Sequence, residues 1–176
     1  KTTTAVNLAA SLAAQNRRVL LIDVDPQGNA TMGAGVNKNG LEQSVYTVLL
    51  GEASMLDARV EAQGGFDLIP ANRELAGAEI ELVSMPDRET KLKDAIHTLK
   101  AAISAVAEEY DYILIDCPPT LNLLTLNALC AADSVLIPMQ CEYYALEGLS
   151  DLVQTLRKMQ QHLNPALEIE GLLRTM

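Results

Sequence analysis

The chain has 176 residues, of which 49% are hydrophobic, and this is enough for one domain with a core of ordinary size. Its formal net charge is -10, from 13 Lys and Arg against 23 Asp and Glu, which excludes a surface that is basic throughout. No apolar run approaches the roughly 20 residues that span a bilayer, and no signal-peptide pattern opens the chain, so we expect a soluble protein.

The first predicted element is a helix that begins almost at residue 1. The opening stretch KTTTAVNLAASLAA carries small and apolar residues at helical spacing. A Lys followed by Thr at a helix start matches the tail of the phosphate-binding loop G-x-x-x-x-G-K-[ST], in which the Lys contacts phosphates and the hydroxyl coordinates Mg²⁺. Lys1 and Thr2 are therefore candidate ligands, although this pair alone is a weak signal.

The next predicted element is a strand over 18–23 that leads into two acids. The run VLLI lacks the alternation of a half-exposed strand, so it indicates a strand buried on both faces. Asp23 and Asp25 follow it directly, and PQG comes after them. Ligands of open α/β sheets bind at the carboxyl ends of the strands, so these acids are candidates for binding a metal or handling water. The alternative is that they only cap a turn.

Beyond these acids, strand-like runs alternate with segments of helical period. Residues 32–65 are rich in glycine, which predicts loops and short helices. Further strands are expected at 66–70, 112–116, 134–139 and 168–173. One apolar helical stripe is expected within 92–106, and a second is formed by Leu149, Val153, Leu156 and Leu163. This alternation predicts an α/β fold with a mostly parallel sheet.

The strand in YDYILIDCPPT ends in a third acid, Asp116, whose expected role is to hold Mg²⁺ through water. The helix-opening Lys-Thr and the two strands that end in acids together supply the lysine, hydroxyl and carboxylates that phosphoryl transfer needs. The acids would then stand where the terminal phosphate of a nucleotide, its Mg²⁺ and an attacking water lie.

The cysteines and histidines point to no further chemistry. Cys117, Cys130 and Cys141 lie far apart in apolar surroundings without the spacing of paired metal ligands, so we expect buried reduced thiols, as is typical of the cytosol. His97 and His162 lie in helical patterns without a partner motif, so we expect surface or structural roles.

Longer stretches of the chain carry a family resemblance. The most specific are DPQGNAT, LAGAEIEL and CEYYALEGL. On these stretches, and on the phosphate-loop pieces, the chain resembles the ParA/Soj family of chromosome- and plasmid-partitioning ATPases, which carry a deviant Walker A motif. The resemblance covers nearly the whole chain. It implies a three-layer P-loop NTPase fold, with a mostly parallel sheet flanked by helices, and a single ATPase domain over 1–176.

The resemblance also implies the cofactors ATP and Mg²⁺ and the residues that bind them. These are Lys1, Thr2 and Thr3 for ATP, and Thr2, Asp23 and Asp116 for the metal. Asp25 would be catalytic together with Lys1, because Lys1 contacts the phosphates while Asp25 positions or activates the hydrolytic water.

Family members dimerise around two ATP molecules, bind double-stranded DNA nonspecifically in that state, and hydrolyse ATP when a ParB-type partner stimulates them. The resemblance therefore implies a cytoplasmic, nucleoid-associated bacterial protein with no membrane contact. The family motif reads KGGxGK[ST], and here everything before the final Lys is absent, as are the strand before it and the last strands and helices of the family. We expect a domain truncated at both ends, with adenine and DNA contacts outside this chain.

Three rival functions remain on the sequence alone. A MinD-like ATPase would keep the fold and position another cargo at a membrane through an amphipathic tail. A nitrogenase-reductase-like electron carrier would need cysteines placed to bridge an iron-sulfur cluster, and Cys117 and Cys141 do not look so placed. A non-hydrolysing binding module is disfavoured because both Asp25 and Asp116 are present.

Overall fold

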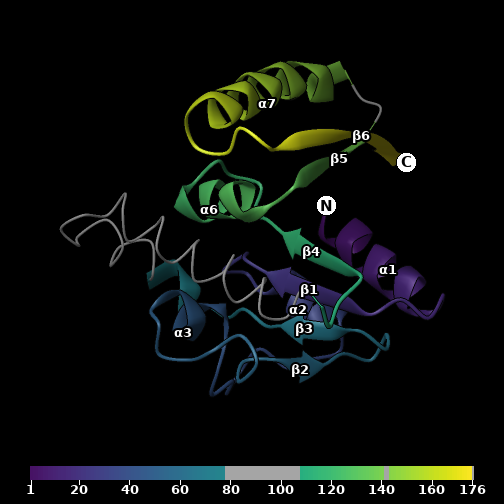
Figure 1. Ribbon diagram of the computed structural model, residues 1–176, viewed down its shortest axis with the longest axis vertical. Helices are drawn as coiled ribbons and strands as arrows, with labels where there is room; N and C mark the ends of the chain where they lie inside the picture. The colour runs from purple at the N-terminus through teal and green to yellow at the C-terminus, as the bar shows by residue number, and fades with distance from the viewer. Residues whose placement is uncertain (78–107, 141–142, 176) are drawn as a thin grey trace.

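The computed structural model describes residues 1–77, 108–140 and 143–175 (Figure 1). Its elements, in chain order, are α1 Thr2–Ala13, β1 Val19–Asp23, α2 Asn29–Gly33, α3 Val45–Leu49, β2 Val60–Glu61, β3 Asp67–Ile69, β4 Tyr112–Asp116, α6 Leu123–Ala131, β5 Ser134–Gln140, α7 Tyr143–His162 and β6 Glu168–Thr175. The helix expected within 92–106, together with His97 and Cys141, lies outside the described residues.

The strands form a mostly parallel arrangement, as predicted. The main sheet has the order β2-β3-β1-β4, and β1 runs parallel to both β3 and β4. The short β2 pairs antiparallel with β3 and was not predicted, because two residues are too few to show a period. The last two strands, β5 and β6, pair with each other in a separate parallel sheet, a division that the sequence did not indicate.

Helices cover both faces of the main sheet, and β1 is therefore buried on both faces. Successive side chains of a strand point to opposite faces. Leu20 and Ile22 belong to a core cluster with residues of α3 and α6, whereas Val19 and Leu21 belong to a cluster with residues of α1 and α2. The continuous apolar run of β1 thus makes the three-layer core that the sequence predicted.

A third core cluster joins α6 and α7 to the smaller sheet (Figure 1). Leu156 and Met159 of α7 are buried in it, together with residues of α6 and β5. The sequence placed Leu163 on this apolar stripe, and that prediction was wrong, because its side chain is 54% exposed. The helix ends at His162, and Asn164 then turns the chain by donating its side-chain amide to backbone carbonyls at the end of α6.

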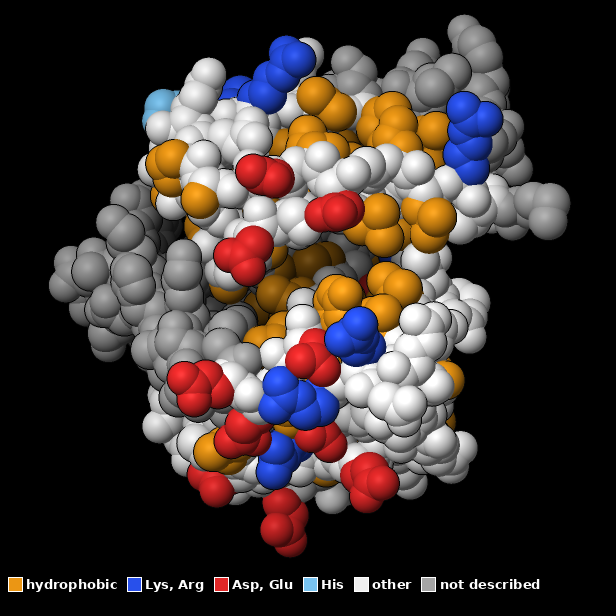
Figure 2. Space-filling model, turned by 45° about the vertical axis from the view of Figure 1, so that its right-hand side comes forward, with side chains coloured by type: hydrophobic (Ala, Val, Ile, Leu, Met, Phe, Trp, Pro, Cys, Tyr) orange, Lys and Arg blue, Asp and Glu red, His pale blue; other side chains and the backbone are white. Residues whose placement is uncertain are grey.

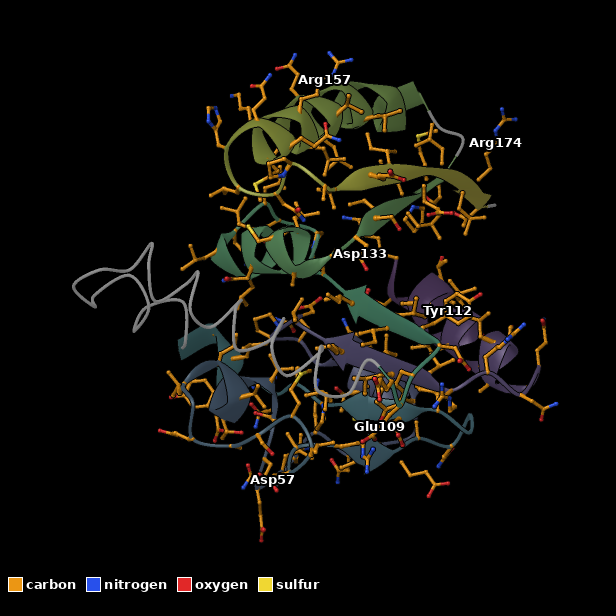
Figure 3. The ribbon with its side chains drawn as sticks, in the orientation of Figure 1. Asp57, Glu109, Tyr112, Asp133, Arg157 and Arg174 are labelled. Carbon is orange, nitrogen blue, oxygen red and sulfur yellow. The ribbon has the colours of Figure 1, made fainter. Side chains whose placement is uncertain are left out.

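The surface mixes both signs of charge with apolar side chains. On the face drawn in Figure 2, acidic and basic side chains lie interspersed over the lower half, with apolar side chains above them. Arg157 and Arg174 point outward from α7 and from the end of β6 (Figure 3). His162 is exposed, as expected. No helix within the described ranges is both long and apolar enough to cross a membrane.

Candidate functional site

Two of the three predicted acids are directly opposite each other at the carboxyl edge of the sheet. Asp23 ends β1 and Asp116 ends β4, and the parallel register of these strands pairs them. Both are buried, with 0% and 3% of their surface exposed. The backbone N–H of Val24 donates to the Asp116 carbonyl at 2.9 Å, so the two strands remain joined just beyond the acids. The sheet therefore brings these carboxylates together, as the sequence predicted.

The carboxylate of Asp23 is occupied by protein donors. Its Oδ2 accepts from the backbone N–H of Thr31 at 2.8 Å and from the Thr31 hydroxyl at 2.7 Å, while its Oδ1 accepts from the backbone N–H of Asp25 at 3.1 Å. Burial raises the pKa of Asp23 from 3.8 to about 6, and the hydrogen bonds from Thr31 and Asp25 limit that rise. These contacts make Asp23 the residue that shapes the loop after β1.

Asp25 lies in the turn that leads from β1 to α2. Its Oδ1 accepts from the backbone N–H of Gln27 at 2.9 Å, and its carbonyl accepts from the N–H of Gly28 at 2.8 Å. Gly28 has φ 61°, a left-handed conformation that a glycine adopts without strain. The Asp25 residue is 7% exposed. Asp25 thus has the turn contact that the alternative interpretation required, and this contact does not prevent the side chain from also meeting a ligand.

Asp116 differs from Asp23 because one of its oxygens has no partner. Within the described part of the chain, Oδ2 of Asp116 is buried and makes no hydrogen bond. A buried acceptor without a partner is costly, and such atoms in native structures commonly meet an ion, water or ligand. Burial raises the pKa of Asp116, while a hydrogen bond from the Thr2 side chain and the positive charge at Lys1 lower it. This oxygen is the strongest sign of a ligand at the carboxyl edge.

The beginning of α1 lies beside Asp116. Lys1 is the N-cap residue of this helix, and its carbonyl accepts from the N–H of Ala5 at 3.0 Å. Thr2 is half-buried and Lys1 is exposed, and both act on the pKa of Asp116. Thr3 is exposed on the first turn. The structure thus brings Lys1 and Thr2 to Asp116. Their roles, and that of Thr3, stay predictions.

The donor set fits a hard cation that retains water. The described residues contain no group of three or more His, Cys, Asp or Glu side chains placed to hold a metal. Mg²⁺ does not require one, because it keeps several waters and is bound through one or two carboxylates together with substrate phosphates. The free Oδ2 of Asp116 and the hydroxyl of Thr2 beside it are oxygen donors of this kind.

The described cysteines form no metal-ligand group at this edge. Cys117 and Cys130 are free and half-buried. Burial raises the pKa of Cys117 to about 12, and the charge of the neighbouring Asp116 raises it further, so this thiol stays protonated at neutral pH. The sequence predicted buried reduced thiols; the two described thiols are only half-buried, and their redox state stays a prediction.

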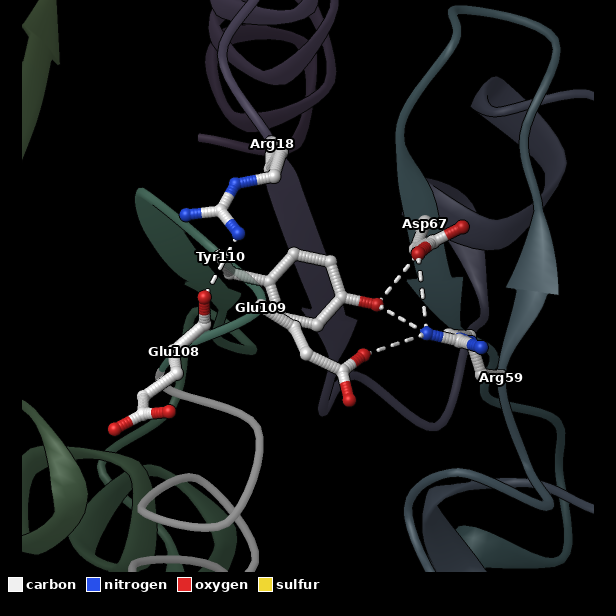
Figure 4. A network of polar contacts seen from close by, with 6 residues as sticks. All are labelled: Arg18, Arg59, Asp67, Glu108, Glu109 and Tyr110. Carbon is white, nitrogen blue, oxygen red and sulfur yellow. Dashed lines mark hydrogen bonds and ion pairs between the residues drawn. The ribbon is translucent and has the colours of Figure 1, made fainter.

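The amino edge of the sheet carries charge but no comparable site (Figure 4). The guanidinium of Arg59 lies 3.0 Å from the Tyr110 hydroxyl and 3.3 Å from a carboxylate oxygen of Glu109, and the Tyr110 hydroxyl donates to Asp67. An open hollow of about 460 Å³ adjoins these residues. Because its acids and bases pair with each other at the surface, this network ties the strands together and contributes little free energy.

Sequence reasoning missed Thr31 and the chain after β3 as parts of the site. The Thr31 hydroxyl accepts from the backbone N–H of Ala71 at 2.9 Å while it donates to Asp23. The Lys38 ammonium donates to the Gln27 carbonyl at 2.6 Å. Thr31 lies within the DPQGNAT stretch, but no spacing rule in that stretch indicates that its hydroxyl donates a hydrogen bond to Asp23.

Comparison with known proteins identifies the family. A family model described as an AAA domain matches residues 1–169. The chain is 56% identical over 177 residues to the sporulation initiation inhibitor protein Soj of Bacillus subtilis, with 100% of this chain and 67% of that protein covered. It is 52% identical over 177 residues to the chromosome partitioning protein ParA of Myxococcus xanthus, with 100% and 60% covered.

A solved structure shows the same fold. The cobyrinic acid a,c-diamide synthase of Mycobacterium smegmatis, with bound ATP analogue and magnesium, superposes with a TM-score of 0.88 at 41% identity, over 98% of this chain and 68% of that one. The chain thus spans about two thirds of the length of the relatives it matches. Its sheet and flanking helices have the P-loop NTPase fold, and with this matched length and identity the chain belongs to the ParA/Soj family of partitioning ATPases.

Proposed function

We propose that the full-length protein is a Mg²⁺-dependent ATPase whose nucleotide phosphates bind at the carboxyl edge of the main sheet. The observation that carries this proposal is the buried, unpartnered Oδ2 of Asp116, which lies in register with Asp23 and beside the first turn of α1. A buried acceptor at this position suits the water shell of a metal ion. The bound ATP analogue and magnesium in the Mycobacterium smegmatis structure support the same cofactors here.

This proposal gives each residue of the site a stated role. Lys1 contacts the phosphates, Thr2 ligates the metal and Thr3 adds a phosphate contact. Bound Mg²⁺ would supply neutralisation of the charge on the phosphates. Asp116 holds the water shell of the metal, Asp23 supports it and fixes the loop after β1, and Asp25 positions the water that attacks. The assignment of Asp25 rests on its place in that loop, two residues after Asp23 and 7% exposed.

The proposed cellular role is the partitioning of chromosome or plasmid DNA. The protein would form a homodimer on ATP, bind double-stranded DNA without sequence preference, and hydrolyse ATP when a ParB-type partner stimulates it, in the cytoplasm and on the nucleoid. The name of the Myxococcus relative, a chromosome partitioning protein ParA, supports partitioning. Because the chain carries a formal charge of -10, its DNA contacts require basic residues gathered locally by dimerisation or supplied by the rest of the protein.

A DNA-binding experiment on the full-length protein tests this role. Retention of duplex DNA in a filter or gel-shift assay should require ATP, should be weak with ADP, and should not depend on sequence. The affinity should fall steeply as salt rises, because phosphate contacts release counterions. Equal retention with ADP and ATP would contradict the proposal. Tight ATP-dependent binding to anionic vesicles, with no DNA binding, would instead support the MinD-like alternative.

A further inference from the structure

A single hydroxyl joins the loop that carries Asp25 to the chain that follows β3. The Thr31 hydroxyl donates to Oδ2 of Asp23 at 2.7 Å and accepts from the backbone N–H of Ala71 at 2.9 Å. Oδ1 of Asp23 in turn accepts from the backbone N–H of Asp25 at 3.1 Å. Thr31 and Ala71 are both 0% exposed, so water does not replace either contact. One continuous line of hydrogen bonds thus joins the backbone N–H of Asp25, the Asp23 carboxylate, the Thr31 hydroxyl and the backbone N–H of Ala71.

The same two segments also touch through the backbone. A Cβ atom built on Gly28 would lie 2.7 Å from the carbonyl oxygen of Ala71 and 3.0 Å from Cδ of Lys38, which is closer than such atoms approach. Lys38 also contacts the loop by donating its ammonium to the Gln27 carbonyl at 2.6 Å. Because the loop after β1 and the exit of β3 are in contact with no space between them, a shift of one segment changes the position of the other.

We propose that Thr31 is a positioning residue that orients Asp25 through Asp23 and couples the Asp25 loop to the segment that follows β3. The proposal rests on the proposed ATPase function. A change in residues 70–77, such as one caused by a partner subunit or a bound protein, would reach Asp25 through this hydroxyl. Thr31 itself contacts neither nucleotide nor metal in this account, and it acts only through the carboxylate it holds.

The hydroxyl is required because it does two things at once. It supplies a donor to a buried carboxylate and an acceptor to a buried N–H, and hydrogen bonds in such a chain strengthen one another. Valine has the same shape but offers neither function, so Thr31→Val leaves the N–H of Ala71 without its partner and removes a hydrogen bond from Asp23. Serine keeps both functions and loses only a methyl group. The pair of variants therefore separates the hydroxyl from packing.

The test is steady-state hydrolysis of ATP by the full-length protein. We expect Thr31→Val to lower kcat by roughly 10- to 100-fold while KM stays within about threefold, because a small misplacement of a catalytic group slows the chemical step. Thr31→Ser should keep at least about half of the wild-type kcat. The matched control is Thr47→Val, since the Thr47 hydroxyl also both donates and accepts, at 2.8 and 3.0 Å, with Ser44 of the α3 cap. Because Thr47 is only half-buried, this control should lose less thermal stability than Thr31→Val, and it should lose no kcat.

A second measurement tests the coupling without an activity assay. In hydrogen exchange followed by mass spectrometry, Thr31→Val should increase the exchange of peptides that contain the N–H of Ala71 and that of Asp25, whereas Thr31→Ser should not. Wild-type exchange of both peptides in a folded Thr31→Val protein would refute the proposal.

The outcomes also distinguish this proposal from the proposed function. If Asp25→Ala abolishes turnover while Thr31→Val has wild-type kcat, the coupling is refuted and the ATPase assignment stands. If Asp25→Ala keeps wild-type turnover, the assignment of Asp25 is itself wrong. If Thr31→Val does not fold, Thr31→Ala replaces it. Loss of kcat in a folded Thr31→Ser variant would show that the methyl group and not the hydroxyl matters, and this would refute the proposal.

Discussion

Replacing Asp25 by Ala separates its catalytic role from its role in the turn. The substitution removes the hydrogen bond that Oδ1 accepts from the Gln27 N–H at 2.9 Å. It leaves the backbone hydrogen bond from Gly28 to the Asp25 carbonyl at 2.8 Å, so the turn keeps its main-chain closure. Asp23 also keeps its contact with the backbone N–H of residue 25, because that contact needs no side chain there. The loop should therefore hold its shape.

The two roles predict effects of very different size. Loss of a side-chain hydrogen bond in a turn costs about 1 kcal/mol of stability. A domain with a stability of about 5 kcal/mol would remain more than about 99% folded after that loss. Loss of a group that positions water lowers the rate by on the order of 10²- to 10⁴-fold. We expect the second effect, with ATP and Mg²⁺ binding nearly intact, so that the Asp25→Ala protein accumulates as the ATP-bound dimer.

The assay is turnover of ATP by the full-length protein, with nucleotide affinity measured by calorimetry and folding by thermal melting. Asn37→Ala is a matched control, because its Oδ1 accepts from the N–H of residue 39 at 3.0 Å with the same spacing of two residues that Asp25 shows. Because its hydrogen bond is exposed, the control should lose no more stability than Asp25→Ala, and it should lose no activity. Wild-type turnover in a folded Asp25→Ala protein would refute the catalytic assignment and leave only the turn.

Two further predictions concern the other acids of the site. Asp116→Ala should weaken Mg²⁺-dependent ATP binding itself, by roughly 10- to 100-fold, because the residue would hold the water shell of the metal, and titration of ATP with and without Mg²⁺ measures this. The pKa of Asp23 is raised from 3.8 to about 6, so the folded protein binds this proton more tightly than the unfolded chain does. The resulting stabilisation of the folded state is full below about pH 4 and is lost as pH rises through 6. Between about pH 5 and about pH 7.5, urea unfolding should show wild type losing on the order of 1 kcal/mol relative to Asp23→Asn, and a constant difference would show that the carboxylate is not so perturbed.

The elements that could be predicted from the sequence are those with a strong local pattern. The run from Val19 to Ile22 is apolar at every position, which is typical of a strand buried on both faces, and the structure confirms such a strand. The acids at 23 and 116 follow apolar runs, so their place at the carboxyl edge follows from strand direction alone. Parallel strands also explain why residues so far apart in sequence meet there.

The features that sequence reasoning missed depend on tertiary contacts. Leu163 continues the helical spacing of α7, but the helix ends one residue earlier, because Asn164 finds carbonyl partners on α6 that no local rule reveals. Thr31 lies eight residues after Asp23, and only the turn through Gly28 brings its hydroxyl back to that carboxylate. The pairing of strands into two sheets likewise depends on neighbours in space, not on the pattern within each strand.

The three acids are alike in sequence, and it is their hydrogen-bond partners that assign them different tasks. Both oxygens of Asp23 accept from the protein, so its carboxylate is already used in shaping the loop and has less capacity for a ligand. Asp116 is also buried, but its Oδ2 has no hydrogen-bond partner among the described residues, so a bound ion or its water would supply the missing contact. Asp25 lies in the turn after β1, and its backbone N–H donates to Asp23. If this division is correct, removal of Asp23 should disturb the fold first, removal of Asp116 should disturb binding first, and removal of Asp25 should disturb the chemical step first.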